Sequence, residues 1–190
     1  MSLTESTMLE LGTLAPEFVL TDVVTGNEVS LDHSQGEKAL LVMFICAHCP
    51  YVKHINRGLA ALGRDYTGKP VAMVAIGSND ATSHHLDSPE GLKEQAETFG
   101  FNFPYLYDET QEVARAYKAA CTPDFFLFDE EFRLVYRGQF DASRPGNGIP
   151  VTGEDLRTAI DLVLAGEPVP TEQRPSMGCN IKWKELAESA

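Results

Sequence analysis

An apolar run that passes directly into a helical pattern constrains the fold of this chain more than any other feature. Residues 39–46 are eight consecutive apolar side chains, as expected for a central strand of a sheet covered on both faces. From residue 52 to residue 62 the apolar positions recur every three or four residues, which predicts an amphipathic helix. A second apolar run, Val71–Ile76, follows the helix. This order predicts a β-α-β unit.

The rest of the chain adds strands and helices around this unit. The expected elements are an N-terminal hairpin in 16–31, a helix in 88–99, a short strand in 104–107, a helix in 108–119, a strand pair in 125–128 and 133–140, and a last helix between 152 and 166. A β-α-β unit followed by an antiparallel strand pair and a final helix is typical of a mixed sheet. We therefore predict an α/β fold with a central mixed β-sheet flanked by helices, an N-terminal β-hairpin and a C-terminal tail.

Length and charge limit the domain count and the partners. A chain of 190 residues is expected to form one domain, residues 1–190, with a core in about 16–166 and a docking tail in about 167–190. The tail begins with three prolines in 167–175. The chain has 28 acidic and 15 basic residues and a net charge of −13. It is therefore a poor ligand for polyanions, and we expect neither nucleic acid nor a membrane as a partner.

The start of the chain shows no secretory signal, because the first six residues contain neither a basic segment nor an apolar one. The apolar run 39–46, eight residues, is shorter than the roughly 20 residues that a membrane-spanning helix needs. We therefore expect a soluble, cytoplasmic protein. Cysteines in the reducing cytosol serve redox, metal-binding or catalytic roles, or are simply buried.

The motif Cys46-Ala47-His48-Cys49 lies where the buried strand ends and the helix begins. A helix N-terminus stabilises a thiolate through its free N–H groups and its dipole, and the thiolate is the reactive form of cysteine. Two intervening residues allow one sulfur to reach the other. We expect the first cysteine, Cys46, to attack a substrate disulfide and the second, Cys49, to release the mixed disulfide. His48 is a candidate for tuning the thiolate, because a positive charge there would stabilise it.

Zinc binding and simple burial are the alternatives for these cysteines. A structural zinc site needs four ligands, commonly from two such pairs, and the sequence holds no second Cys-x-x-Cys. Cys121, His84 or His85 would have to complete a site in space, so metal binding remains a minority interpretation. The strand-to-helix position favours redox chemistry over metal binding, and we predict no metal and no cofactor.

A second landmark, Cys121-Thr122-Pro123-Asp124, directly precedes the apolar strand 125–128. Proline at the start of a strand is ordinary. The Thr122-Pro123 bond becomes a candidate for the cis form only because a Cys-x-x-Cys motif lies upstream.

Together these features resemble the thioredoxin-like superfamily, in its redoxin branch of alkyl hydroperoxide reductase and thiol-specific antioxidant-like proteins. The resemblance covers about residues 16–166 and rests on the entry segment 15–20, the strand that leads into the Cys-x-x-Cys motif, Thr122-Pro123 and the strand 134–138. It implies a thioredoxin-like fold and thiol-disulfide oxidoreductase activity. It also implies that Cys46 attacks, that Cys49 resolves, and that Thr122 and cis-Pro123 bind the substrate.

The chain departs from the family patterns at the motif. Thioredoxin has Trp before its first cysteine and Gly-Pro between the pair, where this chain has Ile45 and Ala47-His48. Peroxidase members place Thr or Ser three residues, and Pro seven residues, before the attacking cysteine. With Cys49 in that role, those positions are Cys46 and Val42. A thiol-dependent peroxidase, with antioxidant activity, is therefore the alternative enzyme.

Two further cysteines, Cys121 and Cys179, lie outside the motif. One hypothesis is that they form a second redox pair that relays electrons or locks the tail. The other is that they are two separate buried thiols. The expected partners are a disulfide-containing protein or small molecule and a reductant system that serves cell redox homeostasis.

Overall fold

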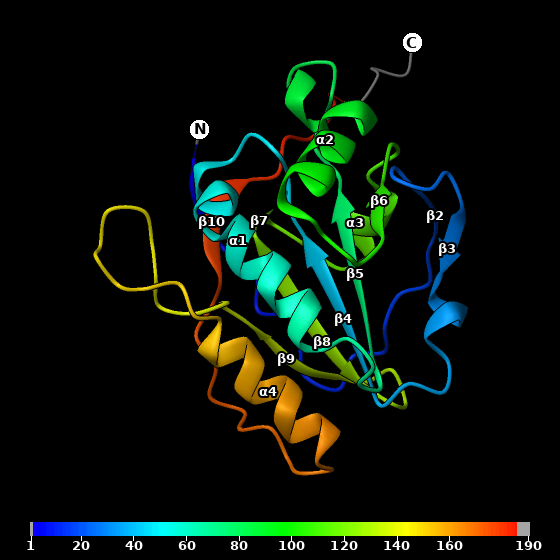
Figure 1. Cartoon of the computed structure of the whole chain (residues 1–190), viewed down its shortest axis with the longest axis vertical. Helices are drawn as coiled ribbons and strands as arrows, with labels where there is room; N and C mark the ends of the chain where they lie inside the picture. Colours follow the sequence, from blue (N-terminus) through cyan, green and yellow to red (C-terminus); the bar gives the residue numbers. More distant parts are fainter. Residues whose placement is uncertain (1, 186–190) are drawn as a thin grey trace.

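The computed structural model describes residues 2–185, and a mixed sheet of seven strands forms its centre (Figure 1). The strand order is β3-β2-β6-β5-β4-β8-β9. These strands are β2 (Val19–Asp22), β3 (Glu28–Ser30), β4 (Ala39–Phe44), β5 (Val71–Gly77), β6 (Tyr105–Tyr107), β8 (Asp124–Asp129) and β9 (Leu134–Gly138). The β4, β5 and β6 strands run parallel, while β8 and β9 on one side and β2 and β3 on the other pair antiparallel.

Strand β4 is buried along its whole length. Its odd-numbered side chains pack into one hydrophobic cluster and its even-numbered side chains pack into the other. This alternation follows from the two-residue repeat of a strand and explains why the sequence there is apolar at every position. The end of β4 therefore lies in the interior, and Cys46 follows it by two residues.

Three helices cover one face of the sheet. They are α1 (Pro50–Asp65), α2 (Pro89–Phe99) and α4 (Glu154–Leu164), whose buried side chains join the odd-numbered side chains of β4. The short helix α3 (Glu112–Ala116) covers the other face together with the N-terminal segment. The expected helix 108–119 is shorter than predicted. Asp108 accepts hydrogen bonds from the backbone N–H groups of Val113 and Ala114, so it ends the preceding loop instead of joining the helix.

A second, small sheet joins segments that are far apart in the sequence. Its order is β1 (Leu3–Glu5), β10 (Met177–Asn180) and β7 (Cys121–Thr122), and both pairings are antiparallel. In Figure 1, β10 and β7 lie beside the N-terminal end of α1. The last strand of the tail therefore lies at the same end of the molecule as the Cys-x-x-Cys motif.

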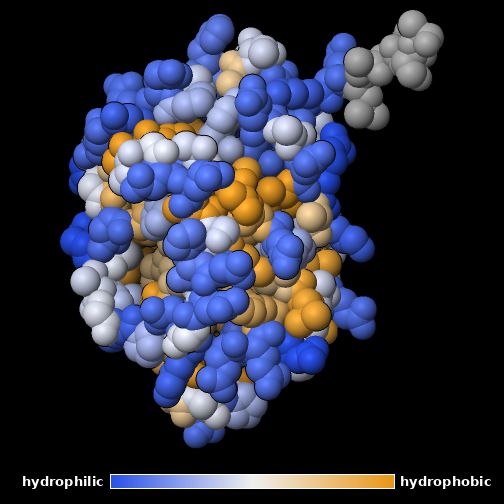
Figure 2. All heavy atoms as spheres, turned by 90° about the vertical axis from the view of Figure 1, so that its right-hand side faces the viewer, coloured by the Kyte–Doolittle hydropathy of each residue, from blue (hydrophilic) through white to orange (hydrophobic). Residues whose placement is uncertain are grey.

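The predicted fold class is confirmed, including the N-terminal hairpin, which is formed by β2 and β3. Hydrophilic side chains cover much of the face seen in Figure 2, with an apolar patch near its middle. Among the described residues, no helix has both the length and the apolar character needed to cross a membrane.

Candidate functional site

Cys49 is the residue that the fold places at the start of α1. It is the N-cap, with extended backbone angles, and Pro50 occupies the first helical position, where its missing N–H removes no helical hydrogen bond. The free N–H groups and the dipole of the helix point toward this residue. Its side chain is completely buried.

Several donors stabilise the negative charge of Cys49. The pKa of its thiol is lowered to about 5, chiefly because the S–H of Cys46 donates a hydrogen bond to it. The S–H and the backbone N–H of Cys179 add to this effect, as does the backbone N–H of Val52, while burial opposes it. Cys49 is therefore held as a thiolate when the cysteines are reduced.

Cys46 has the opposite environment. Burial raises its pKa well above the ordinary thiol value, and the hydrogen bond to Cys49 and the charge of Asp87 act in the same direction. Its sulfur lies 3.3 Å from Thr122 Oγ1. The sequence reasoning expected the attacking thiolate at Cys46. The structure places Cys49, and not Cys46, at the N-cap of α1, while both side chains are completely buried.

Thr122 and Pro123 face the thiols, and the bond between them is cis. The Thr122 carbonyl lies 3.4 Å from Cys49 Sγ and accepts a hydrogen bond from the Cys49 S–H when Cys49 is protonated. Thr122 is also paired with Cys179 in the register of β7 and β10. The strand edge that was predicted to bind substrate is thus occupied by the tail of the chain itself, and the substrate role of these two residues stays a prediction.

Asp87 organises the turn between the two cysteines. Its Oδ1 accepts hydrogen bonds from the N–H groups of Ala47 at 2.8 Å and His48 at 3.1 Å, and its Oδ2 contacts His48 Nδ1. Asn79 Nδ2 donates to the same Oδ2 at 2.9 Å. Burial acts to raise the pKa of Asp87, but the hydrogen bonds from His48 and Asn79 outweigh it, so the pKa is lowered.

His48 is turned toward Asp87, and its ring packs on that of His84 with 4.6 Å between the centroids. Among the hydrogen bonds of the described residues, none joins this ring to a cysteine sulfur. The tuning of the thiolate by His48 therefore stays a prediction. Cys46, His48 and Asp87 each have one potential ligand atom within 4.8 Å of the others, which is a possible three-ligand set for a metal ion.

The proposed pairing of Cys121 with Cys179 is not what the structure shows. Cys179 Sγ lies 2.6 Å from Cys49 Sγ, while Cys121 Sγ donates to the carbonyl of Pro123 at 3.6 Å. The register explains the difference. Thr122 lies opposite Cys179 and Cys121 lies opposite Asn180, so Cys121 and Cys179 project to opposite faces of the small sheet.

Sequence reasoning missed the polar residues that hold the motif. Besides Asp87 and Asn79, the buried Gln95 of α2 donates to the backbone carbonyl of Cys46 at 3.1 Å and accepts from Tyr105 Oη at 2.9 Å. Asp87 and Asn79 lie in a polar loop that gives no periodic signal. Only the position of Gln95, on the buried side of an amphipathic helix, was an available sign that it has an internal partner.

The thiol end of the molecule is closed. Cys46, Cys49 and Cys121 have no exposed surface and Cys179 has 1%. The hollow beside Tyr51, which Pro123 also lines, holds only about 10 Å³. A substrate disulfide therefore reaches these sulfurs only after a covering segment has moved.

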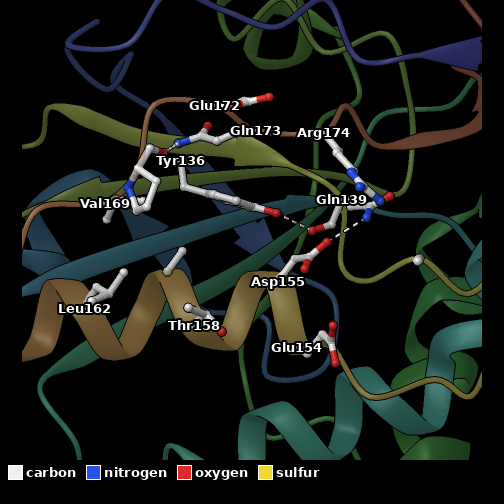
Figure 3. Close-up of a pocket in the computed structure, with 13 residues that line it drawn as sticks. Tyr136, Gln139, Glu154, Asp155, Thr158, Leu162, Val169, Glu172, Gln173 and Arg174 are labelled. Carbon is white, nitrogen blue, oxygen red and sulfur yellow. Dashed lines mark hydrogen bonds between the residues drawn. The ribbon is translucent and has the colours of Figure 1, made fainter.

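A larger hollow of about 430 Å³ lies elsewhere, between α4, β9 and the segment 169–174 (Figure 3). Polar groups inside it are paired with each other. Tyr136 Oη donates to the Gln139 carbonyl at 2.5 Å, and Gln139 Nε2 donates to Asp155 at 2.6 Å. No cysteine or histidine of the described chain lines this hollow, so it offers no thiol chemistry.

Known proteins resemble this chain in sequence and in structure. The thiol-disulfide oxidoreductase ResA of Geobacillus kaustophilus (strain HTA426) is 29% identical over 67% of this chain and 68% of its own length. A solved structure of an uncharacterized conserved protein from Geobacillus kaustophilus is 57% identical, with a TM-score of 0.96, over 98% of this chain and 99% of that one. A hypothetical protein from Sinorhizobium meliloti 1021 is 51% identical, with a TM-score of 0.94, over 96% of this chain and 100% of that one.

The family model for redoxins matches residues 10–154, which is most of the chain and includes the cysteine motif, the turn that Asp87 holds, and the Thr122-Pro123 segment. The redoxin branch of the resemblance inferred from the sequence is thereby confirmed, and the chain belongs to the redoxin family.

Proposed function

We propose that this protein is a thiol-disulfide oxidoreductase in which Cys49 is the nucleophile and Cys46 its partner in the Cys-x-x-Cys motif. The carrying observation is the environment of Cys49, which is the N-cap of α1 and has a pKa lowered to about 5. Such a sulfur is a thiolate at neutral pH, and the thiolate is the form that attacks disulfides. The curated relatives named as thiol-disulfide oxidoreductases support the same reaction class.

The reaction proceeds by two exchanges. The Cys49 thiolate attacks a substrate disulfide, forms a mixed disulfide with one substrate sulfur and releases the other as a thiolate. A second thiol of the protein then attacks the Cys49 sulfur and releases the first substrate sulfur. Cys46, the other thiol of the motif, is the candidate for this step, because its S–H lowers the pKa of Cys49. The substrate gains two electrons, and the protein is left with one disulfide.

Insulin reduction with dithiothreitol as the electron donor tests this proposal, and peroxide consumption by the same preparation tests the peroxidase alternative. We expect insulin reduction that depends on Cys49. Peroxide consumption without insulin reduction would instead support the peroxidase. The absence of both activities in a folded, reduced preparation would contradict the proposal.

A metal-binding protein is a second candidate, because Cys46, His48 and Asp87 place their ligand atoms close together. Against it, Asp87 already accepts hydrogen bonds from two backbone N–H groups and from Asn79, which occupy its oxygens. Elemental analysis of protein purified without chelators separates the two functions. Stoichiometric zinc that blocks thiol alkylation would favour metal binding.

A further inference from the structure

Strand β10 places Cys179 directly against the nucleophilic cysteine. The strand is held on both sides, because Cys179 pairs with Leu3 of β1 and with Thr122 of β7. The Ser176 hydroxyl donates to the Pro123 carbonyl at 2.5 Å, which fixes the strand just before its first residue. Cys179 is therefore positioned by a backbone network and does not lie there by side-chain freedom alone.

Gly178 shows how closely this strand approaches the Thr122-Pro123 segment. A Cβ atom at residue 178 would lie 1.9 Å from the Thr122 carbonyl oxygen and 3.2 Å from Pro123 Cδ. Only glycine fits this contact, since a methyl group would collide with the backbone of β7. The next side chain along the strand, Cys179, then points at the start of α1, where Cys49 lies.

The two sulfurs are close enough to react with little movement. Cys179 Sγ and Cys49 Sγ are 2.6 Å apart, compared with about 2.05 Å in a disulfide bond. Both sulfurs are buried in the closed molecule. Cys49 thus has two neighbouring thiols, one from its own motif and one from β10.

We propose that Cys179 is a third redox-active thiol, which resolves mixed disulfides at Cys49 and forms a Cys49–Cys179 disulfide. This inference rests on the proposed oxidoreductase function. A substrate disulfide enters when β10 moves aside, and the return of β10 brings Cys179 onto the Cys49 sulfur. The Cys49–Cys179 bond forms, the bond from Cys49 to the substrate sulfur breaks, and the released substrate thiolate takes the proton that Cys179 loses.

The two protein disulfides would then interconvert without an external oxidant. When the Cys46 sulfur attacks Cys49 in the Cys49–Cys179 disulfide, the Cys46–Cys49 bond forms and Cys179 leaves and takes up the proton that Cys46 gave up. No electrons are gained or lost in this exchange. The Cys49–Cys179 disulfide links the tail covalently to the motif, whereas the Cys46–Cys49 disulfide does not.

Peptide mapping of the full-length chain tests the proposal directly. Trypsin places Cys46 and Cys49 in residues 39–53, Cys121 in 119–133 and Cys179 in 158–182, because the Arg174-Pro175 bond is not cleaved. The reduced protein is treated with glutathione disulfide, its remaining thiols are alkylated, and it is digested without reductant. A Cys49–Cys179 disulfide joins two peptides, whereas a Cys46–Cys49 disulfide stays within one.

We expect the joined peptides in the wild type, near-complete joining in Cys46→Ser, and none in Cys179→Ser. Cys121→Ser is the matched control, since Cys121 is an equally buried cysteine on the neighbouring strand whose side chain faces away. It should give the wild-type pattern. Circular dichroism of each variant establishes that the variant is folded. The search for joined peptides in the wild type tests the proposal even if a variant does not fold.

Two results separate this inference from the proposed function. One result is that the wild type reduces insulin and forms only the Cys46–Cys49 disulfide, while Cys46→Ser retains glutathione on Cys49. This result would overturn the role of Cys179 and leave the oxidoreductase function intact. Joined peptides without insulin reduction would support Cys179 as a redox-active thiol and contradict the oxidoreductase function.

Discussion

Cys49 and Cys121 are both completely buried thiols, and both lie beside the Thr122-Pro123 segment. Their acidities differ in opposite directions. The pKa of Cys49 is lowered to about 5, while burial raises the pKa of Cys121 far above the ordinary value, with the charge of Asp124 adding to the effect. Equal burial is thus accompanied by a lowered thiol pKa in one region and a raised thiol pKa in the other.

The neighbours of each sulfur explain this difference. Cys49 lies at a helix N-terminus and is surrounded by donors, namely backbone N–H groups and two S–H groups. The Cys121 S–H instead donates a hydrogen bond to the Pro123 carbonyl, and Cys121 lies near the buried carboxyl group of Asp124. The comparison teaches that hydrogen-bond donors, and not exposure, select which of the buried cysteines ionises.

The largest expected effect on insulin reduction comes from removing the proposed nucleophile, Cys49. Cys49→Ser should lower the kcat/KM of insulin reduction on the order of 10³-fold or more, as expected when a nucleophile is lost. Cys121→Ser should leave the rate unchanged. Equal losses in the two variants would mean that the acidity difference has no part in the reaction.

A pH titration examines the same contrast without a substrate. Because the folded pKa of Cys49 is about 5, the ultraviolet absorbance of a thiolate should appear in the reduced protein around pH 5 and be absent there in Cys49→Ser. The lowered pKa also stabilises the fold above the ordinary thiol pKa, and this contribution is lost as pH falls through 5. Cys121→Ser should titrate like the wild type, and a first transition near the ordinary thiol pKa would refute the assignment.

Strand β10 covers Cys49 through the side chain of Cys179. Gly178→Ala introduces a methyl group that collides with the Thr122 carbonyl, so β10 should be displaced. We expect a loss of about 1–3 kcal/mol in the free energy of unfolding, typical of overpacking. Cys49 should also react faster with iodoacetamide, while Cys121 should stay protected. An unchanged alkylation rate in a destabilised variant would show that β10 does not control access.

Asp87→Asn tests the support of the motif. The substitution keeps the shape but removes the charge that raises the pKa of Cys46 and holds His48. We expect a loss of about 1 kcal/mol in stability at neutral pH, from weaker hydrogen bonds to the Ala47 and His48 N–H groups. The pKa of Asp87 is lowered, so the wild-type advantage should fade as acid protonates it. Urea unfolding of both proteins at several pH values measures this, and an advantage independent of pH would contradict it.

The smallest effect on activity is expected at Asp124, near Cys121. Burial raises the pKa of this carboxyl to about 7, so the folded state binds its proton more tightly than the unfolded state. Its contribution to stability is present below about pH 4 and is lost as pH rises through 7. The stability of the wild type relative to Asp124→Asn should therefore decrease between pH 4 and pH 7, with insulin reduction unaffected. A difference that grows with pH would disprove this.

Much of the fold was predictable because the buried strands and amphipathic helices leave clear periodic patterns. The strand expected in the run 39–46 is formed as β4 over Ala39–Phe44, and the helix expected after Cys49 is formed as α1, which begins at Pro50. The short helix α3 was overestimated, since the competition of the Asp108 side chain for backbone N–H groups has no periodic signal. The candidate site was predictable only as far as the Cys-x-x-Cys motif and the Thr122-Pro123 landmark.

By itself the sequence determined that a pair of cysteines follows a buried strand at the start of a helix, because spacing and hydrophobic period are local properties. It did not determine which cysteine ionises or which thiol faces it. Those outcomes depend on where α1 begins and on the register of β10 against β7, which brings Cys179 to Cys49 across 130 residues of sequence. Only the tertiary structure sets these contacts, because a one-residue shift of β10 would turn Cys179 to the opposite face of the small sheet.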